Sequence, residues 1–267
     1  MLVDGKDYFK AIYYSISNSE SLVVILAWDI DSRISLLRGE DAEGKHPVQL
    51  GPFLDHQTEI KENLHVYILD WDYAKLFATG REIMPKLKFE LRTSPRVHFK
   101  LDDALPRGAC HHQKVVVIDE RIAFCGGLDL TKGRWHTSEH LPQHSCDRKD
   151  SNENPYRAYH DVSCLLEGEV ARDLAVLAQE RWQASCSNTI KSVEAEKNEN
   201  SPWPDYIKPM FQDIRVAITR TWTKEEECIR ESMQMTIDLL NLAEDIIYIE
   251  NQYLTAEPFA KAMSWKI

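Results

Sequence analysis

Two runs of sequence organise this chain: HHQKVVVID at residues 111–119 and AFCGGLD at residues 123–129. Residues 115–118 are continuously apolar and β-branched, which predicts a strand covered on both faces. A histidine and a lysine, His112 and Lys114, stand at the mouth of this strand. Such groups are costly beside a buried strand unless they have partners, so their position indicates a functional site.

The composition limits the classes of protein to consider. The chain has 267 residues and is 43% hydrophobic, enough for one large domain or two small ones. Its net charge of −11 argues against a nucleic-acid partner, because non-specific binding to nucleic acid needs a basic surface. The six cysteines are scattered without a CxxC pair, so a zinc site is not expected.

Neither a signal peptide nor an apolar run of membrane-spanning length is evident. We therefore predict a cytoplasmic protein, which would reach a lipid substrate only by peripheral attachment to the membrane surface.

Apolar runs alternate with amphipathic stretches, and this order predicts the α/β class. The predicted helices cover residues 7–18, 53–62, 169–184 and 225–242, with part of 75–91, and the predicted strands cover 22–26, 66–69, 97–102, 115–118, 159–166, 214–218 and 246–249.

Two segments without periodicity divide the chain. Residues 131–155 form a polar stretch that is long for a loop, and it fits a functional loop or a solvated excursion equally well. Residues 191–204 are charged and poor in apolar side chains, which is typical of a linker. We predict a first domain at 1–190, this linker, and an incomplete second domain at 205–267.

The end of the chain resembles its beginning. A helix, a polar turn and an apolar strand lead to Trp28-Asp29-Ile30-Asp31 in the first part and to Glu250-Asn251-Gln252-Tyr253 in the last. Two such units suggest an internal duplication. At the same spacing, the counterpart of His112 would fall about 70 residues beyond Ile267, so we expect the second copy to be truncated.

The opening motif suits phosphoryl transfer without a metal. A neutral imidazole attacks phosphorus without a second base, and Lys114, two residues along a strand, would share a face with His112. Asp119 could hold a ring N–H of the histidine, and Gly126 and Gly127 would let the backbone approach a phosphate. On these residues alone, a purely structural role is the alternative.

The same residues resemble the HxKxxxxD (HKD) motif of the phospholipase D superfamily. The resemblance extends over nearly the whole chain and is strongest to the lipid-acting, transphosphatidylating branch. It rests on residues 27–32 (AWDIDS), 126–135 (GGLDLTKGRW), 159–162 (YHDV), 180–182 (ERW) and 249–253 (IENQY).

This resemblance implies two α/β halves, each a sheet flanked by helices that gives one histidine motif to a shared site. One histidine attacks the phosphodiester and the other protonates the leaving alcohol, with no cofactor and no metal. If the roles of the family's motif residues apply here, His112 is the nucleophile or the general acid, Lys114 binds phosphate and Asp119 orients His112. Asp129, Gly126 and Gly127 would lie beside the site, and His160 would be a weaker, more distant contributor.

Only one such motif is present, so the partner motif must come from a missing C-terminal half or from a second protomer. Because only one of the family's two motifs is present, three functions are possible. The first is a phospholipase D or transphosphatidylase acting on phospholipids such as phosphatidylcholine, with this chain as its N-terminal half. The others are a homodimeric phosphodiesterase or nuclease of the same superfamily, and a catalytically inactive fragment.

Overall fold

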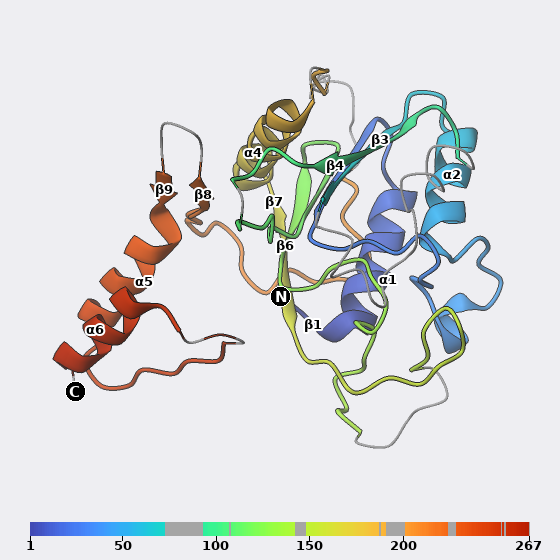
Figure 1. The fold of residues 1–267 in the computed structure, drawn as a ribbon. Helices are drawn as coiled ribbons and strands as arrows, with labels where there is room; N and C mark the ends of the chain where they lie inside the picture. Colours follow the sequence, from blue (N-terminus) through green and yellow to red (C-terminus); the bar gives the residue numbers. More distant parts are fainter. Residues whose placement is uncertain are drawn as a thin grey trace. The chain divides into compact units, whose positions relative to one another are not determined.

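The computed structural model describes residues 1–72, 93–106, 108–141, 148–186, 188–190, 201–223, 228–251, 253 and 255–266 (Figure 1). The chain forms two compact units, one of Met1–Ala104 with Cys110–Ile214 and one of Leu105–Ala109 with Arg215–Ile267. Most of the predicted linker lies outside the described residues, as does the predicted helix at 75–91. The division at 190 and 205 stays a prediction.

The first unit is built on a seven-stranded mixed sheet with the strand order β1-β7-β6-β5-β2-β3-β4. Strand β5 lies in its middle and pairs antiparallel with both β2 and β6, while β2, β3 and β4 run parallel. The central, doubly covered strand predicted at 115–118 is therefore confirmed. The strands are β1 (Leu2–Val3), β2 (Leu22–Ala27), β3 (His65–Trp71), β4 (Val97–Asp102), β5 (Val115–Ile118), β6 (Ile122–Gly126) and β7 (Val162–Glu167).

Helices cover both faces of this sheet, and the strand sequences show why. Alternate side chains of β2, Val23 and Ile25, join a core with helices α1 (Asp4–Ser17) and α2 (Leu50–Ile60). The intervening side chains, Val24 and Leu26, are also buried and point to the opposite face. Helix α4 (Glu169–Ser185) contacts β2, β4, β5, β6 and β7, and Figure 1 shows it across the sheet from α1 and α2. The predicted α/β class is confirmed.

Strand β7 begins later than predicted, at Val162 rather than Tyr159. Residues 159–161 are not part of the strand and make side-chain contacts instead. The Tyr159 hydroxyl donates to Asp161, and the His160 ring contacts the Asp4 carboxylate. A 3₁₀ turn, η1 (Gly39–Ala42), interrupts the long connection between β2 and α2.

The second unit contains strands β8 (Thr221–Thr223) and β9 (Cys228–Arg230) and helices α5 (Glu231–Leu242) and α6 (Glu257–Lys266). The strands predicted at 214–218 and 246–249 are wrong. The β-branched composition of both runs is suited to a sheet, but no described strand pairs with them. Ile246 is 83% and Tyr248 82% exposed. The predicted repeat therefore has its helix but not its strand.

No helix among the described residues combines the length and apolarity needed to cross a bilayer.

Candidate functional site

His112 and Lys114 converge on the indole ring of Trp28, which follows directly after β2. The His112 ring packs edge-on against Trp28 with centroids 5.7 Å apart, and the Lys114 ammonium lies 5.7 Å from the Trp28 ring centroid. Trp71, at the end of the parallel neighbour β3, stacks on Trp28 at 6.2 Å. The predicted pairing of histidine and lysine on one side of the chain is therefore present, with an aromatic platform between them.

Asp129 fixes both the lysine and the platform. Its carboxylate lies 3.0 Å from Nζ of Lys114 and accepts the backbone N–H of Trp28 at 3.0 Å. Asp129 is 2% and Lys114 8% exposed, so this ion pair is shielded from water and is held more rigidly than a surface pair would be. Lys114 also donates to the backbone oxygen of His112 at 3.2 Å, which ties the two motif residues together.

His112 itself is exposed, as a group that meets a substrate must be. Its pKa is lowered from 6.5, first by partial desolvation of the ring and then by the positive charge of Lys114, with Asp129 opposing the shift. At neutral pH the imidazole is therefore uncharged and keeps a nitrogen lone pair. A neutral, accessible imidazole beside an ammonium group has the properties of a nucleophile toward an anionic phosphodiester.

The residue before the motif histidine is anchored inside the protein. His111 is 2% exposed, and its Nδ1 lies 3.1 Å from the carboxylate of Asp102 at the end of β4. Arg181 and Ser185 of α4 also donate to this carboxylate. Burial alone would raise the pKa of Asp102, but the hydrogen bond from His111 and the charge of Arg181 prevail and lower it to about 2.

The irregular backbone at 111–114 is thus held on both sides of His112, by His111 on Asp102 and by Lys114 on Asp129. Burial lowers the pKa of His111, so this second histidine is also neutral at pH 7.

The predicted role of Asp119 as the partner of the His112 ring is wrong. Asp119 follows β5 at the end opposite His112, and the four strand residues between span about 13 Å. Its buried carboxylate accepts the backbone N–H groups of Glu20, Ser21 and Leu22 at 2.8–2.9 Å. Asp119 therefore fixes the turn that leads into β2, and its φ of 50° is one that aspartate tolerates.

The two glycines of the motif are explained by close packing. A Cβ at Gly126 would overlap Ser163 and the carbonyl of Val162, and one at Gly127 would overlap the Asp161 carboxylate. Val162 and Ser163 belong to β7, and Asp161 directly precedes it. The structure thus accounts for both glycines by the protein atoms beside them. That they also lie beside a bound phosphate stays a prediction.

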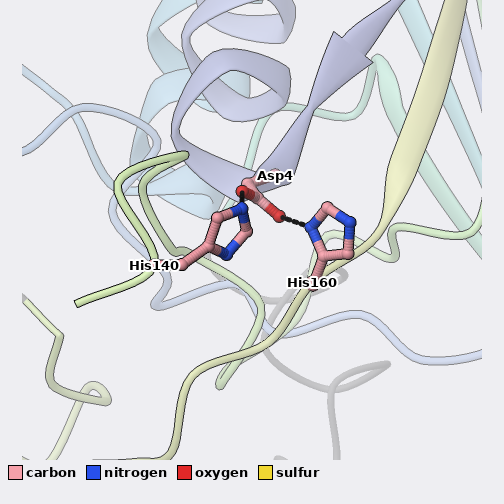
Figure 2. Close-up of side chains that lie close together, drawn as sticks. All are labelled: Asp4, His140 and His160. Atoms are coloured by element: carbon pink, nitrogen blue, oxygen red, sulfur yellow. Dashed lines mark hydrogen bonds and ion pairs between the residues drawn. The ribbon is translucent and has the colours of Figure 1, made fainter. Parts of the chain in front are cut away.

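His160 is grouped with residues that the motif did not suggest. Its Nδ1 lies 2.7 Å from the carboxylate of Asp4, which is also 3.4 Å from Nε2 of His140 (Figure 2). Within the described residues, this is the group of histidine and carboxylate side chains whose donor atoms are close enough to share a metal ion.

Sequence reasoning missed several contributors to the site. Trp28 follows the strand predicted at 22–26 and appeared in the repeat, but its ring was not assigned a role. The link from Asp102 to His111 and Arg181 had no signal in the sequence, because these residues meet only when β4, the motif and α4 are assembled.

The site thus lies just before the central strand of an α/β sheet, where His112 and Lys114 meet Trp28. A family model described as "Phospholipase D" matches residues 15–260. The chain therefore belongs to the phospholipase D family.

Among its relatives, phospholipase D C of Dictyostelium discoideum is 30% identical over 235 residues, which are 76% of this chain and 14% of that protein. Phospholipase D zeta 2 of Arabidopsis thaliana is 29% identical over 70% of this chain and 20% of its own length. The chain thus spans about a fifth or less of these relatives.

Among the solved structures that match is that of Nuc, a phospholipase D family member from Salmonella typhimurium. It has 13% sequence identity, a TM-score of 0.42 and coverage of 68% of this chain and 89% of that one.

Proposed function

We propose that this chain supplies one histidine half-site of a phospholipase D-type phosphodiesterase. The observation that carries the proposal is the convergence of neutral, exposed His112 and shielded Lys114 on Trp28. The membership of the chain in the phospholipase D family supports the same reaction class.

In the proposed reaction the His112 imidazole attacks phosphorus, and the bond from phosphorus to the alcohol oxygen breaks. A second histidine protonates the departing alcohol. Water, or another alcohol, then attacks phosphorus and gives its proton to this second histidine, and the bond from phosphorus to the His112 nitrogen breaks, which restores the imidazole. Lys114 stabilises the charge that grows on the phosphoryl oxygens, while Asp129 and Trp28 hold the ammonium in place.

The second histidine belongs, on this proposal, to a C-terminal half or to another protomer. The relatives named as phospholipases D favour a glycerophospholipid substrate presented at a membrane surface, with the protein attached peripherally. The acidic net charge of −11 favours such a substrate over nucleic acid.

The covalent half-reaction tests the proposal without depending on full turnover. The chain is mixed, in excess, with vesicles of phosphatidylcholine that carries a label in its phosphate. The reaction is then quenched in alkali, where phosphohistidine survives. We expect label on the peptide that contains His112, and phosphatidylethanol when ethanol is present and the second motif is supplied by a longer reading frame.

His112→Ala should abolish labelling, whereas His56→Ala, on α2, should leave it unchanged. Labelling that persists in the His112→Ala protein would refute the assignment. Labelling from bis-p-nitrophenyl phosphate but not from the lipid would keep the phosphodiesterase chemistry and refute the lipid substrate.

A further inference from the structure

Three side chains from distant parts of the first unit meet outside the His112 site. Asp4 begins α1, His140 lies in the loop after β6, and His160 precedes β7. Figure 2 shows both imidazole rings turned toward the Asp4 carboxylate, one at each oxygen. One donor atom from each residue lies within 4.8 Å of the other two.

The carboxylate at the centre of this group is deeply buried. Asp4 is 0% exposed, whereas the side chains of His140 and His160 are 46% and 45% exposed. An ionised carboxylate removed from water needs a compensating positive charge. Asp4 Oδ1 accepts the backbone N–H of Asp161, but Oδ2 accepts no hydrogen bond from the described residues and faces His140.

The backbone holds Asp4 in an unusual conformation. Its φ is 65°, in the left-handed region, at the first residue of a helix. The Asp4 N–H is bonded to the carbonyl of Asp161 at 2.8 Å, so β1 and the approach to β7 fix this geometry. Such strain persists only where the surroundings impose it, and it is concentrated at sites that bind ligands. Here it directs the carboxylate at two imidazoles.

We propose that Asp4, His140 and His160 form a binding site for a divalent transition-metal cation of the Zn²⁺ class. Two imidazole nitrogens and one carboxylate oxygen suit Zn²⁺ or Co²⁺, whereas Ca²⁺ and Mg²⁺ prefer a shell of oxygens. In a tetrahedral zinc site, neighbouring ligand atoms are about 3.4 Å apart. The distance from Asp4 Oδ2 to His140 Nε2 is 3.4 Å. Because both imidazole side chains are about half exposed, water would supply the remaining ligand.

The cation would hold together segments that lie close to His112. The loop that carries His140 also carries Asp129 and Arg134, and the positive charge of Arg134 acts on His112. Arg134 lies 4.3 Å from the ring centroid of Tyr159, the neighbour of His160. A metal bound to both histidines and to Asp4 would therefore fix the loop and the approach to β7 against α1. This inference does not depend on the proposed phosphodiesterase activity.

Metal content and stability test the site directly. The purified chain is stripped with a chelator, incubated with Zn²⁺, Co²⁺, Ca²⁺ or Mg²⁺, passed through a desalting column and analysed by atomic emission. We expect one equivalent of Zn²⁺ or Co²⁺ to be retained, a rise in the thermal midpoint with these two ions, and visible Co²⁺ absorption bands typical of fewer than six ligands.

Substitutions assign the ligands. His140→Ala and His160→Ala should each weaken Zn²⁺ binding by about 100-fold or more. Asp4→Asn should weaken it similarly while keeping the backbone, since asparagine tolerates a positive φ. His56→Ala, a histidine on α2, is the matched control and should bind as the wild type does.

A wild-type chain that retains no Zn²⁺ or Co²⁺ would overturn the proposal and leave the two imidazoles themselves as the partners of Asp4. Retention that is unchanged in the His140→Ala, His160→Ala double variant would place the metal elsewhere. Stabilisation by Ca²⁺ but not by Zn²⁺ would refute the assigned class of cation.

Discussion

The structure gives Asp119 a role in stability, and this role can be tested by removing its carboxylate. Each hydrogen bond to a charged acceptor contributes about 1.5–3 kcal/mol. Of the three N–H groups that Asp119 binds, the one on Leu22 is buried, the one on Ser21 is partly buried, and Glu20 can regain water. We expect Asp119→Ala to lower the free energy of unfolding by about 3–4 kcal/mol.

In a unit of this size, such a loss corresponds to a fall of roughly 8–12 °C in Tm. Urea unfolding followed by tryptophan fluorescence measures the change. Asp119→Asn keeps one acceptor oxygen and should lose about half as much. The control is Asp150→Ala, because Asp150 also accepts two backbone N–H groups but in an exposed loop, where water can replace it at a cost below about 1 kcal/mol.

The same variants distinguish the two roles of Asp119. If Asp119 acts only through the turn before β2, the titration of His112, followed by NMR of labelled histidine, should be the same in Asp119→Asn as in the wild type. A stability change below about 0.5 kcal/mol together with an altered His112 titration would refute the structural role. That result would restore Asp119 as the partner of the motif histidine.

Three further predictions concern the charges and packing around the motif. Lys114→Met should raise the pKa of His112, because the Lys114 charge that lowers it is lost while Asp129 remains; an NMR titration that shows no rise would contradict the arrangement. Asp102→Asn should lower the free energy of unfolding by about 2–3 kcal/mol at pH 7, since the pKa of Asp102 falls from 3.8 to about 2 on folding. Because a lowered carboxyl pKa stabilises only the ionised form, this difference should shrink as the pH falls from about 4 toward 2, and a difference independent of pH in urea titrations would argue against it. Gly127→Ala should lower the free energy of unfolding by about 1–3 kcal/mol, because the new methyl group forces the Asp161 carboxylate aside. An unchanged Tm would show that the space beside Gly127 is larger than the structure indicates.

The central sheet was predictable because its strands are local signals. The runs at 22–26 and 115–118 are buried on both faces, and the run at 66–69 is buried except for the half-buried Tyr67. Their continuous apolar character is visible in the sequence without knowledge of the neighbouring strands. The strands predicted at 214–218 and 246–249 have the same composition but are unpaired among the described residues. A strand needs a neighbour as well as a suitable sequence, and single-sequence patterns do not report the neighbour.

The candidate site was predictable only where its residues are close in sequence. His112 and Lys114 are two residues apart and both contact Trp28, although they lie in irregular backbone before β5 rather than on a strand. The contacts of Asp119 and His160 join residues about a hundred or more positions apart, so the sequence identified both residues but not their partners. The motif spacing suggested that Asp119 serves the histidine, whereas the strand between them separates the two by its own length.

The pairing of β1 with β7 has a consequence for the synthesis of the protein. Leu2 leaves the ribosome 161 residues before Ser163, its partner in the sheet. At about 5–20 residues per second, the edge strand waits roughly 8–30 s for its neighbour. Asp4 waits with it, because His140 and His160 emerge just before Ser163. The middle of the sheet can pair first, and the edge that orders Asp4 closes last, when most of the first unit has already been made.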